Sequence, residues 1–224
     1  MVEQALTGAQ FRIINPQDFY TIEGVKLPNG SYGAVQVTKK LLDGGRSYIQ
    51  RSLPMHITKT GWGPGSGPLI TAVLTALFDN KGVEGVEELK ALFAGDFKEW
   101  NMTSTGITYR AIHDLVTHDI GLPEQTTLEA RLVGPDGYVD KKMSQVMQAL
   151  LGNNDADKIN TVYKWVTGGD AYLWRLNERP TKDENRVLLL GGGGSGICAG
   201  ANDLLDLPAR GMRVAPQIST ENRS

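Results

Sequence analysis

Two histidine–aspartate pairs, His113–Asp114 and His118–Asp119, are the residues whose types first suggest catalysis or metal binding. Imidazole and carboxylate groups bind divalent metals, and imidazole exchanges protons near neutral pH. The spacing does not favour a shared site, because residues five apart lie well off one face of a helix and on opposite faces of a strand. The third histidine, His56, stands alone. We therefore expect ordinary surface or hydrogen-bonded histidines and no metal site.

Nucleotide binding is a second chemistry that the sequence suggests, because it contains two glycine-rich stretches. Gly191, Gly193 and Gly196 match the dinucleotide fingerprint G-x-G-x-x-G after a short apolar run. The fold that uses this fingerprint needs further strand–helix units after it, and only the 28 residues 197–224 follow. The other stretch, 59–67, precedes a predicted helix but lacks the Lys-Ser/Thr pair of a phosphate-binding loop. Both patterns disfavour a nucleotide cofactor.

The sequence contains one cysteine, Cys198, which excludes an internal disulfide and a cysteine-based zinc site. It also has no convincing Ser/His/Asp or Cys/His constellation, since such a triad is defined by geometry that spacing cannot show. We accordingly predict a non-enzymatic protein with no catalytic residue, no metal ligand and no cofactor.

Length and composition are those of a globular protein. The 224 residues, 40% hydrophobic and 21% charged, are enough to bury a sizeable core, so we treat 1–224 as a single elaborated domain. The net charge of −2, with charges scattered along the chain, disfavours a nucleic-acid partner. We find neither a signal peptide nor an apolar run near the ~20 residues of a membrane span. The expected location is therefore cytoplasmic or on a virus particle.

Hydrophobic periodicity and turn signals predict groups of strands and groups of helices that follow one another along the chain. The predicted strands are 10–14, 31–39, 47–51, 103–109, 128–133, 138–139, 172–176 and 186–190. The predicted helices are 68–78, 83–100, 140–151 and 154–167. Helix 68–78 is apolar nearly all round and should be buried. This order has no regular βαβ alternation, which indicates an α+β fold.

The stretch after strand 186–190 is the most unusual part of the sequence, because glycine takes six of the ten positions from Gly191 to Gly200. Glycine is costly in ordered backbone and gives a core no side chain to bury. One interpretation is a flexible surface loop. Another starts from the codons: every residue from 191 to 205 belongs to the set that arises when both adenines of the asparagine codon AAC are varied.

This pattern, followed by the closing segment 207–215, resembles the variable proteins of diversity-generating retroelements, in particular their archaeal and viral branch. The resemblance covers residues 171–213. It implies a C-type-lectin-like domain with mixed short strands and several packed helices, whose region 171–216 carries the variable surface. The ligand-binding positions that it implies are Leu189, Gly192, Gly193, Ser195, Ile197, Cys198, Gly200, Asn202, Asp203 and Leu205. The surrounding scaffold positions that it implies are Arg186, Ala209, Arg210, Gly211 and Arg213.

The expected function is therefore non-enzymatic recognition of a variable ligand, a protein or another macromolecule, through a diversified C-terminal surface. Replacing an exposed loop side chain usually changes stability by less than about 0.5 kcal/mol, so many sequences can share one scaffold. Because glycine has no side chain and this stretch has no aromatic anchor, we expect this variant to bind weakly.

Two alternatives remain open. The chain could be a structural subunit of a virus particle or another homo-oligomeric assembly, with the glycine loops at subunit contacts. It could also be an enzyme of the formylglycine-generating type, which resembles the same closing strand. That enzyme class relies on paired cysteines, and the single Cys198 argues against it.

Overall fold

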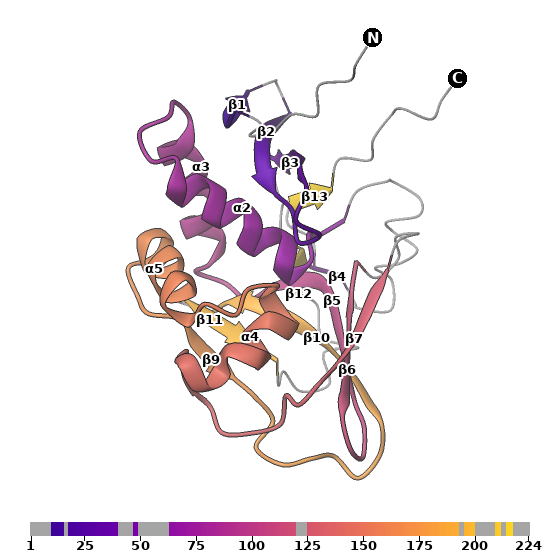
Figure 1. Ribbon diagram of the computed structural model, residues 1–224. Helices are drawn as coiled ribbons and strands as arrows, with labels where there is room; N and C mark the ends of the chain where they lie inside the picture. Colours follow the sequence, from indigo (N-terminus) through magenta and orange to yellow (C-terminus); the bar gives the residue numbers. More distant parts are fainter. Residues whose placement is uncertain are drawn as a thin grey trace, which may run out of the picture.

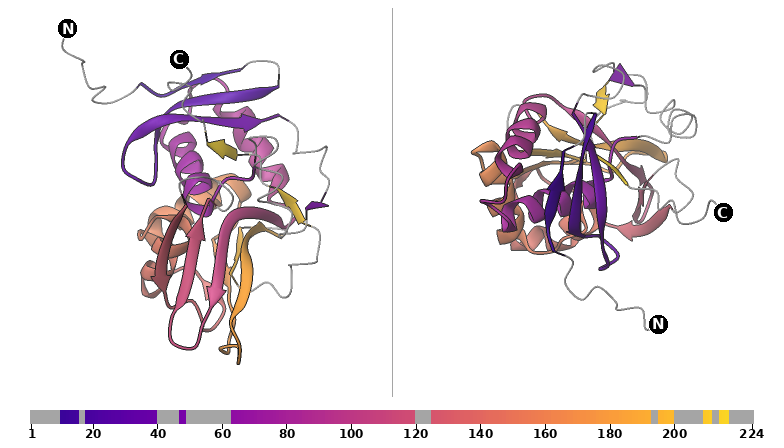
Figure 2. Two further views of the ribbon diagram at one scale, coloured as in Figure 1. Left: turned by 90° about the vertical axis from the view of Figure 1, so that its right-hand side faces the viewer. Right: turned by 90° about the horizontal axis from the view of Figure 1, so that it is seen from above.

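The computed structural model describes residues 10–15, 18–39, 47–48, 63–119, 125–192, 195–199, 209–211 and 214–216. These residues form two β-sheets with helices between them (Figure 1). In the left view of Figure 2 the small N-terminal sheet lies above the helices and the larger sheet lies below them. The mixture of helices and sheets confirms the predicted α+β class.

The smaller sheet joins the N-terminal strands to the closing segment of the chain. Its strands, in spatial order, are β1 (Arg12–Ile14), β2 (Phe19–Lys26), β3 (Tyr32–Thr38) and β13 (Val214–Pro216), and all pairs are antiparallel. Strand β2 is not among the strands predicted from the sequence. Its pairing shifts register between Ile22 and Val25, and this irregularity breaks the alternation of apolar residues that identifies a strand.

The larger sheet contains nine strands within the described residues. Its main path runs through β4 (Ser47–Tyr48), β12 (Ala209–Gly211), β5 (Asn101–Tyr109), β10 (Glu184–Gly191), β11 (Gly196–Cys198), β9 (Tyr172–Trp174) and β8 (Gly137–Tyr138). Strands β6 (Asp114–His118) and β7 (Thr126–Ala130) extend it from the second half of β5. The pairs β12–β5 and β11–β9 are parallel, and the other pairs are antiparallel.

The strand partners differ from the local expectation in two places. The turn 134–137 does not join two strands that pair with each other: β7 pairs with β6, and β8 pairs with β9. Strand β4 follows β3 in the sequence, but it pairs with β12, which lies far away in the sequence. A turn signal shows where the chain reverses, but the pairing is decided by segments far away in the sequence.

Four helices match the predicted ones. They are α2 (Gly67–Asp79), α3 (Val86–Asp96), α4 (Ser144–Leu151) and α5 (Ala156–Thr167). Asp155 caps α5 by accepting a hydrogen bond from the backbone N–H of Lys158. Asp140 caps a short 3₁₀ turn, η3 (Lys141–Met143), that leads into α4. As predicted, α2 is largely buried, and it contacts both sheets, through β2 and β5.

A buried histidine connects three of these elements. The backbone N–H of Gly67 donates to Thr105 Oγ1 (3.0 Å), which lies 2.9 Å from Nδ1 of His118. The ring also hydrogen-bonds the backbone of Ala149. Burial lowers the pKa of His118 to about 4, so the ring is neutral at neutral pH. His118 therefore holds β5, β6 and α4 together and is a hydrogen-bonded structural histidine, as expected.

We predict that the protein loses stability as the pH falls from about 7 to about 4. The pKa of His118 is about 4 in the folded chain and 6.5 ordinarily, so the unfolded chain takes up the proton first. The stabilisation is complete above pH 6.5 and is lost toward pH 4, with a magnitude on the order of 3 kcal/mol. Urea unfolding across this range measures it. His118→Gln should lower stability at neutral pH and flatten the profile; an unchanged slope would contradict the prediction.

Candidate functional site

The start of the glycine stretch is a tight turn packed against Trp100. Strand β10 ends at Gly191, which pairs with Gly196 at the start of β11. A Cβ atom on Gly192 would lie 2.2 Å from the Trp100 indole, and one on Gly196 would lie 2.9 Å from it. Gly192 also has φ +80°, in the left-handed region. Glycine is needed here because the backbone lies directly on an aromatic ring.

Five of the ten predicted ligand-binding positions are described, and three of these five are buried. Leu189, Ser195 and Ile197 are 4%, 5% and 0% exposed. The prediction is corrected for these three, because a buried side chain offers no contact to a ligand. Ile197 belongs to the hydrophobic core, and Ser195 Oγ donates to the carbonyl of Asp170.

The other predicted positions divide into two groups. Cys198 is half-buried and Gly192 is exposed, although its packing on Trp100 leaves no room for a side chain. The positions that lie outside the described residues are Gly193, Gly200, Asn202, Asp203 and Leu205. Among the predicted scaffold positions, Arg186 is buried and pairs with Glu184 at 2.5 Å, and Ala209, Arg210 and Gly211 form β12. Arg213 is not described.

Three aromatic side chains lie in contact beside this stretch, and we call Tyr138, Tyr172 and Trp174 the aromatic row. The ring centroids of Tyr138 and Tyr172 are 5.1 Å apart in a T-shaped arrangement, and those of Tyr172 and Trp174 are 4.8 Å apart. Tyr138 is 67% exposed and Trp174 is 46% exposed. The row is therefore a solvent-facing aromatic surface rather than part of the core.

The strand register explains why these rings share one face. Tyr138 in β8 lies opposite Tyr172 in β9, and Trp174 follows two residues later, while Leu173 between them is buried in the core. Cys198 in β11 lies opposite Trp174. Because cross-strand partners point to the same side of a sheet, Cys198 lies on the face of the aromatic row.

Trp100 lies on this face as well. Gly196 pairs with Tyr172 across β11 and β9, so a Cβ on Gly196 would point to the same side as the Tyr172 ring. A Cβ in that direction would lie against the Trp100 indole. The outer face at this edge of the larger sheet therefore combines the aromatic row, the half-buried Cys198 and the part-exposed Trp100.

The aromatic row is a cluster of hydrophobic side chains at the surface. Exposed aromatic residues in mutual contact mark interaction surfaces, because single exposed hydrophobic residues are common but clustered ones are not.

Within the described residues, no group of three His, Cys, Asp or Glu side chains could hold a metal ion. The described chain also contains no helix whose length and hydrophobicity would let it cross a membrane.

The histidine–aspartate pairs have structural partners in the structure. Asp114 is fully buried, and its carboxylate accepts from Arg179 Nη1 (2.5 Å) and from the backbone N–H of Leu132 (2.8 Å). His113 lies 3.1 Å from Glu129. Burial raises the pKa of Asp119, against the opposing effect of hydrogen bonds from two serine hydroxyls. These four side chains therefore do not form one set of metal ligands.

Sequence reasoning did not identify the aromatic row. Tyr172, Leu173 and Trp174 show the alternation of a strand with one buried face, which was a usable signal that Tyr172 and Trp174 lie together. The sequence gives no local sign of the third ring, because Tyr138 reaches the row through the pairing of β8 with β9.

We predict that Gly192→Ala destabilises the fold by at least about 2 kcal/mol, since it adds both a left-handed non-glycine residue and a clash with Trp100. Gly95→Ala in α3 is the control, because nothing lies within 4 Å of its added Cβ and helix propensity favours alanine. Urea unfolding compares the two variants. Equal stability of Gly192→Ala and the wild type would show that position 192 tolerates side chains.

Comparison of the chain with protein-family models, with curated proteins and with solved structures finds no match.

Proposed function

We propose that the protein is a non-enzymatic binding protein, and that the aromatic row forms the constant part of its ligand-binding surface. One observation carries this proposal: Tyr172 contacts both Tyr138 and Trp174, and the latter two rings are exposed on the outer face of the sheet. Tyrosine and tryptophan dominate binding energy at interfaces, where they supply a large contact area at low entropic cost.

The surroundings of the row favour a protein as the ligand. Protein interfaces combine an apolar, aromatic centre with a polar rim. Polar groups flank the row: Asp170, two residues before Tyr172, forms an ion pair with Lys164 at 3.0 Å, and Asp136 precedes Tyr138 by two residues. Asp136 also accepts a hydrogen bond from the backbone N–H of Arg175.

Ala199, the residue before the predicted variable position Gly200, lies beside this surface, and this supports diversification there. The backbone N–H of Ala199 donates to the carbonyl of Trp174 (2.8 Å), and the buried Tyr109 hydroxyl donates to the carbonyl of Ala199. The chain is thus anchored next to the row immediately before the predicted variable positions Gly200, Asn202, Asp203 and Leu205. On this proposal, constant aromatic anchors are combined with variable neighbours.

The C-type-lectin-like fold is part of the same proposal. It is supported by the pairing of β13 with β3, through which the segment that resembles a closing strand joins the N-terminal sheet. The buried Leu189, Ser195 and Ile197 then belong to the scaffold, and variation is confined to Gly193, Cys198 and the predicted positions after Cys198.

The first prediction of this proposal concerns the gene. Sequencing the locus in several isolates should show a near-copy of the bases that encode residues 191–205, with differences where the copy has adenine, beside a reverse transcriptase gene. Variation should fall at codons 193, 198, 200, 202, 203 and 205 and avoid codons 191, 192 and 196, whose residues lack room for a side chain. If the locus contains no such repeat, the proposed diversification is wrong.

The second prediction concerns the surface. We would display the chain with positions 200, 202, 203 and 205 randomised and select for binding to a purified test protein. Replacing Tyr138 and Trp174 by serine should reduce the number of binders at least about tenfold, because the anchors are lost. Tyr32→Ser in β3 is the control, since this tyrosine is 52% exposed and belongs to the other sheet.

Equal recovery of binders with and without the row would contradict the proposed surface. The structural-subunit alternative gives a different result. If the wild-type chain forms concentration-dependent oligomers that the Tyr138→Ser, Trp174→Ser variant abolishes, the row is a contact between copies of this chain.

A further inference from the structure

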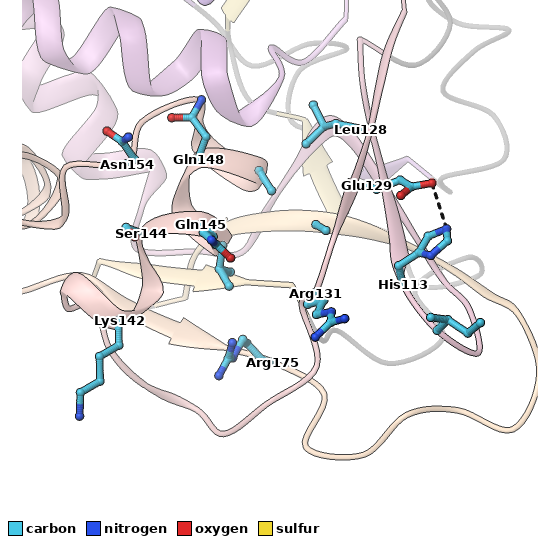
Figure 3. A pocket seen from close by; sticks show the side chains of 14 residues that line it. His113, Leu128, Glu129, Arg131, Lys142, Ser144, Gln145, Gln148, Asn154 and Arg175 are labelled. Carbon is cyan, nitrogen blue, oxygen red and sulfur yellow. Dashed lines mark ion pairs between the residues drawn. The ribbon is translucent and has the colours of Figure 1, made fainter.

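A cleft of about 740 Å³ lies between helix α4 and the strands β6 and β7 (Figure 3). Its volume is in the range of about 300–1,000 Å³ that is typical of small-molecule sites. The lining comes from three parts of the chain: residues 112–113 before β6 together with 128–131 in and after β7, residues 142–154 in and around α4, and Arg175 after β9. No residue of the aromatic row lines the cleft, so it is a separate feature from the proposed protein-binding surface.

The charged side chains of the cleft are predominantly cationic. Arg131, Lys142 and Arg175 line it, and Glu129 is the acidic residue among the lining residues. Figure 3 shows the Glu129 carboxylate pointing to His113, whose Nε2 lies 3.1 Å away. Within the described chain, neither the Arg131 guanidinium nor the Lys142 ammonium has an ion-pair partner. The cleft therefore carries an excess of positive charge.

Arg175 is held in place by the turn 134–136. Its Nε donates to the carbonyl of Pro135 (3.1 Å), and its backbone N–H donates to Asp136 Oδ1 (2.6 Å). A Cβ on Gly134 would lie 2.3 Å from Nη2 of this guanidinium, so glycine leaves the room that the side chain occupies. The two terminal amino groups of Arg175 have no hydrogen-bond acceptor among the described residues. A positioned guanidinium with free donors is suited to a planar or tetrahedral oxyanion.

The rest of the lining combines apolar side chains with neutral hydrogen-bonding groups. Ser144, Gln145, Gln148 and Asn154 border the cleft with side chains that both donate and accept. Partial burial lowers the pKa of Arg175, with Asp136 opposing this effect, and a guanidinium remains charged at neutral pH. Together these groups offer charge for an anion and hydrogen bonds for the body of a small molecule.

We infer that this cleft binds a small multivalent oxyanion, a phosphate ester or a polycarboxylate, with Arg175 as the directional contact and Arg131 and Lys142 as the source of further positive charge. The inference does not depend on the proposed protein-binding function. A ligand with two or more negative charges is attracted more strongly by this excess of positive charge, and the positioned guanidinium of Arg175 pairs with one of its oxyanion groups. A monovalent anion such as acetate gains less from the same excess of charge.

Isothermal titration of the full chain at low salt tests the inference with pyrophosphate, citrate and acetate as probes. We expect pyrophosphate, citrate or both to bind and acetate not to bind, and the preference between the first two identifies the source of the oxyanion. Arg175→Gln and Arg131→Gln should each weaken binding by roughly tenfold. Lys98→Gln, which removes one charge from an exposed residue after α3 and outside the cleft, is the matched control.

A second variant separates positioning from charge. Gly134→Ala keeps every charge but displaces the Arg175 guanidinium, so it should weaken the oxyanion while circular dichroism shows a folded chain. Two results would overturn the inference: no binding of either multivalent probe, or equal weakening in Lys98→Gln and Arg175→Gln, which would mean nonspecific attraction to surface charge.

Discussion

Strand β5 lies at the centre of the larger sheet and carries buried hydroxyl and amide side chains that must find hydrogen-bond partners. Thr103 Oγ1 donates to the carbonyl of Leu188 in β10 (2.9 Å), and Thr105 bonds Gly67 and His118. An unpaired buried polar group costs about 1–3 kcal/mol, so these contacts restrict which elements can lie beside β5. The positions of α2, β6 and β10 all follow from this requirement.

The same requirement places the candidate binding surface. Asn101 Nδ2 donates to the carbonyls of Asp96 (2.6 Å) and Glu99 (2.7 Å), which fixes the chain between α3 and β5. Trp100 lies within this segment, and its indole covers Gly192 and Gly196. Gly192 and Gly196 therefore have no room for a side chain, and β11 is held beside β9, where the aromatic row lies.

Local sequence signals predicted the parts of this structure that depend on neighbouring residues. The apolar character of 68–78 located a buried helix, because helical periodicity depends only on residues a few positions apart. Composition also directed attention to the glycine stretch, but the reason for Gly192 lies in Trp100, which is far away in the sequence. The aromatic row was missed for the same reason, since Tyr138 meets Tyr172 only through strand pairing.

Burial and backbone geometry divide the glycine stretch into parts with different freedom to change. Gly191, Gly192 and Gly196 face backbone or indole atoms at distances that no Cβ can occupy, and Ser195 and Ile197 are buried. A substitution in this part therefore destabilises the fold, whatever its effect on binding. The positions proposed to vary after this part, Gly200, Asn202, Asp203 and Leu205, follow Ala199 in the sequence, and two hydrogen bonds anchor Ala199 beside Trp174 and Tyr109. A binding protein that is to change its specificity without losing its fold needs this separation between a fixed turn and a variable continuation.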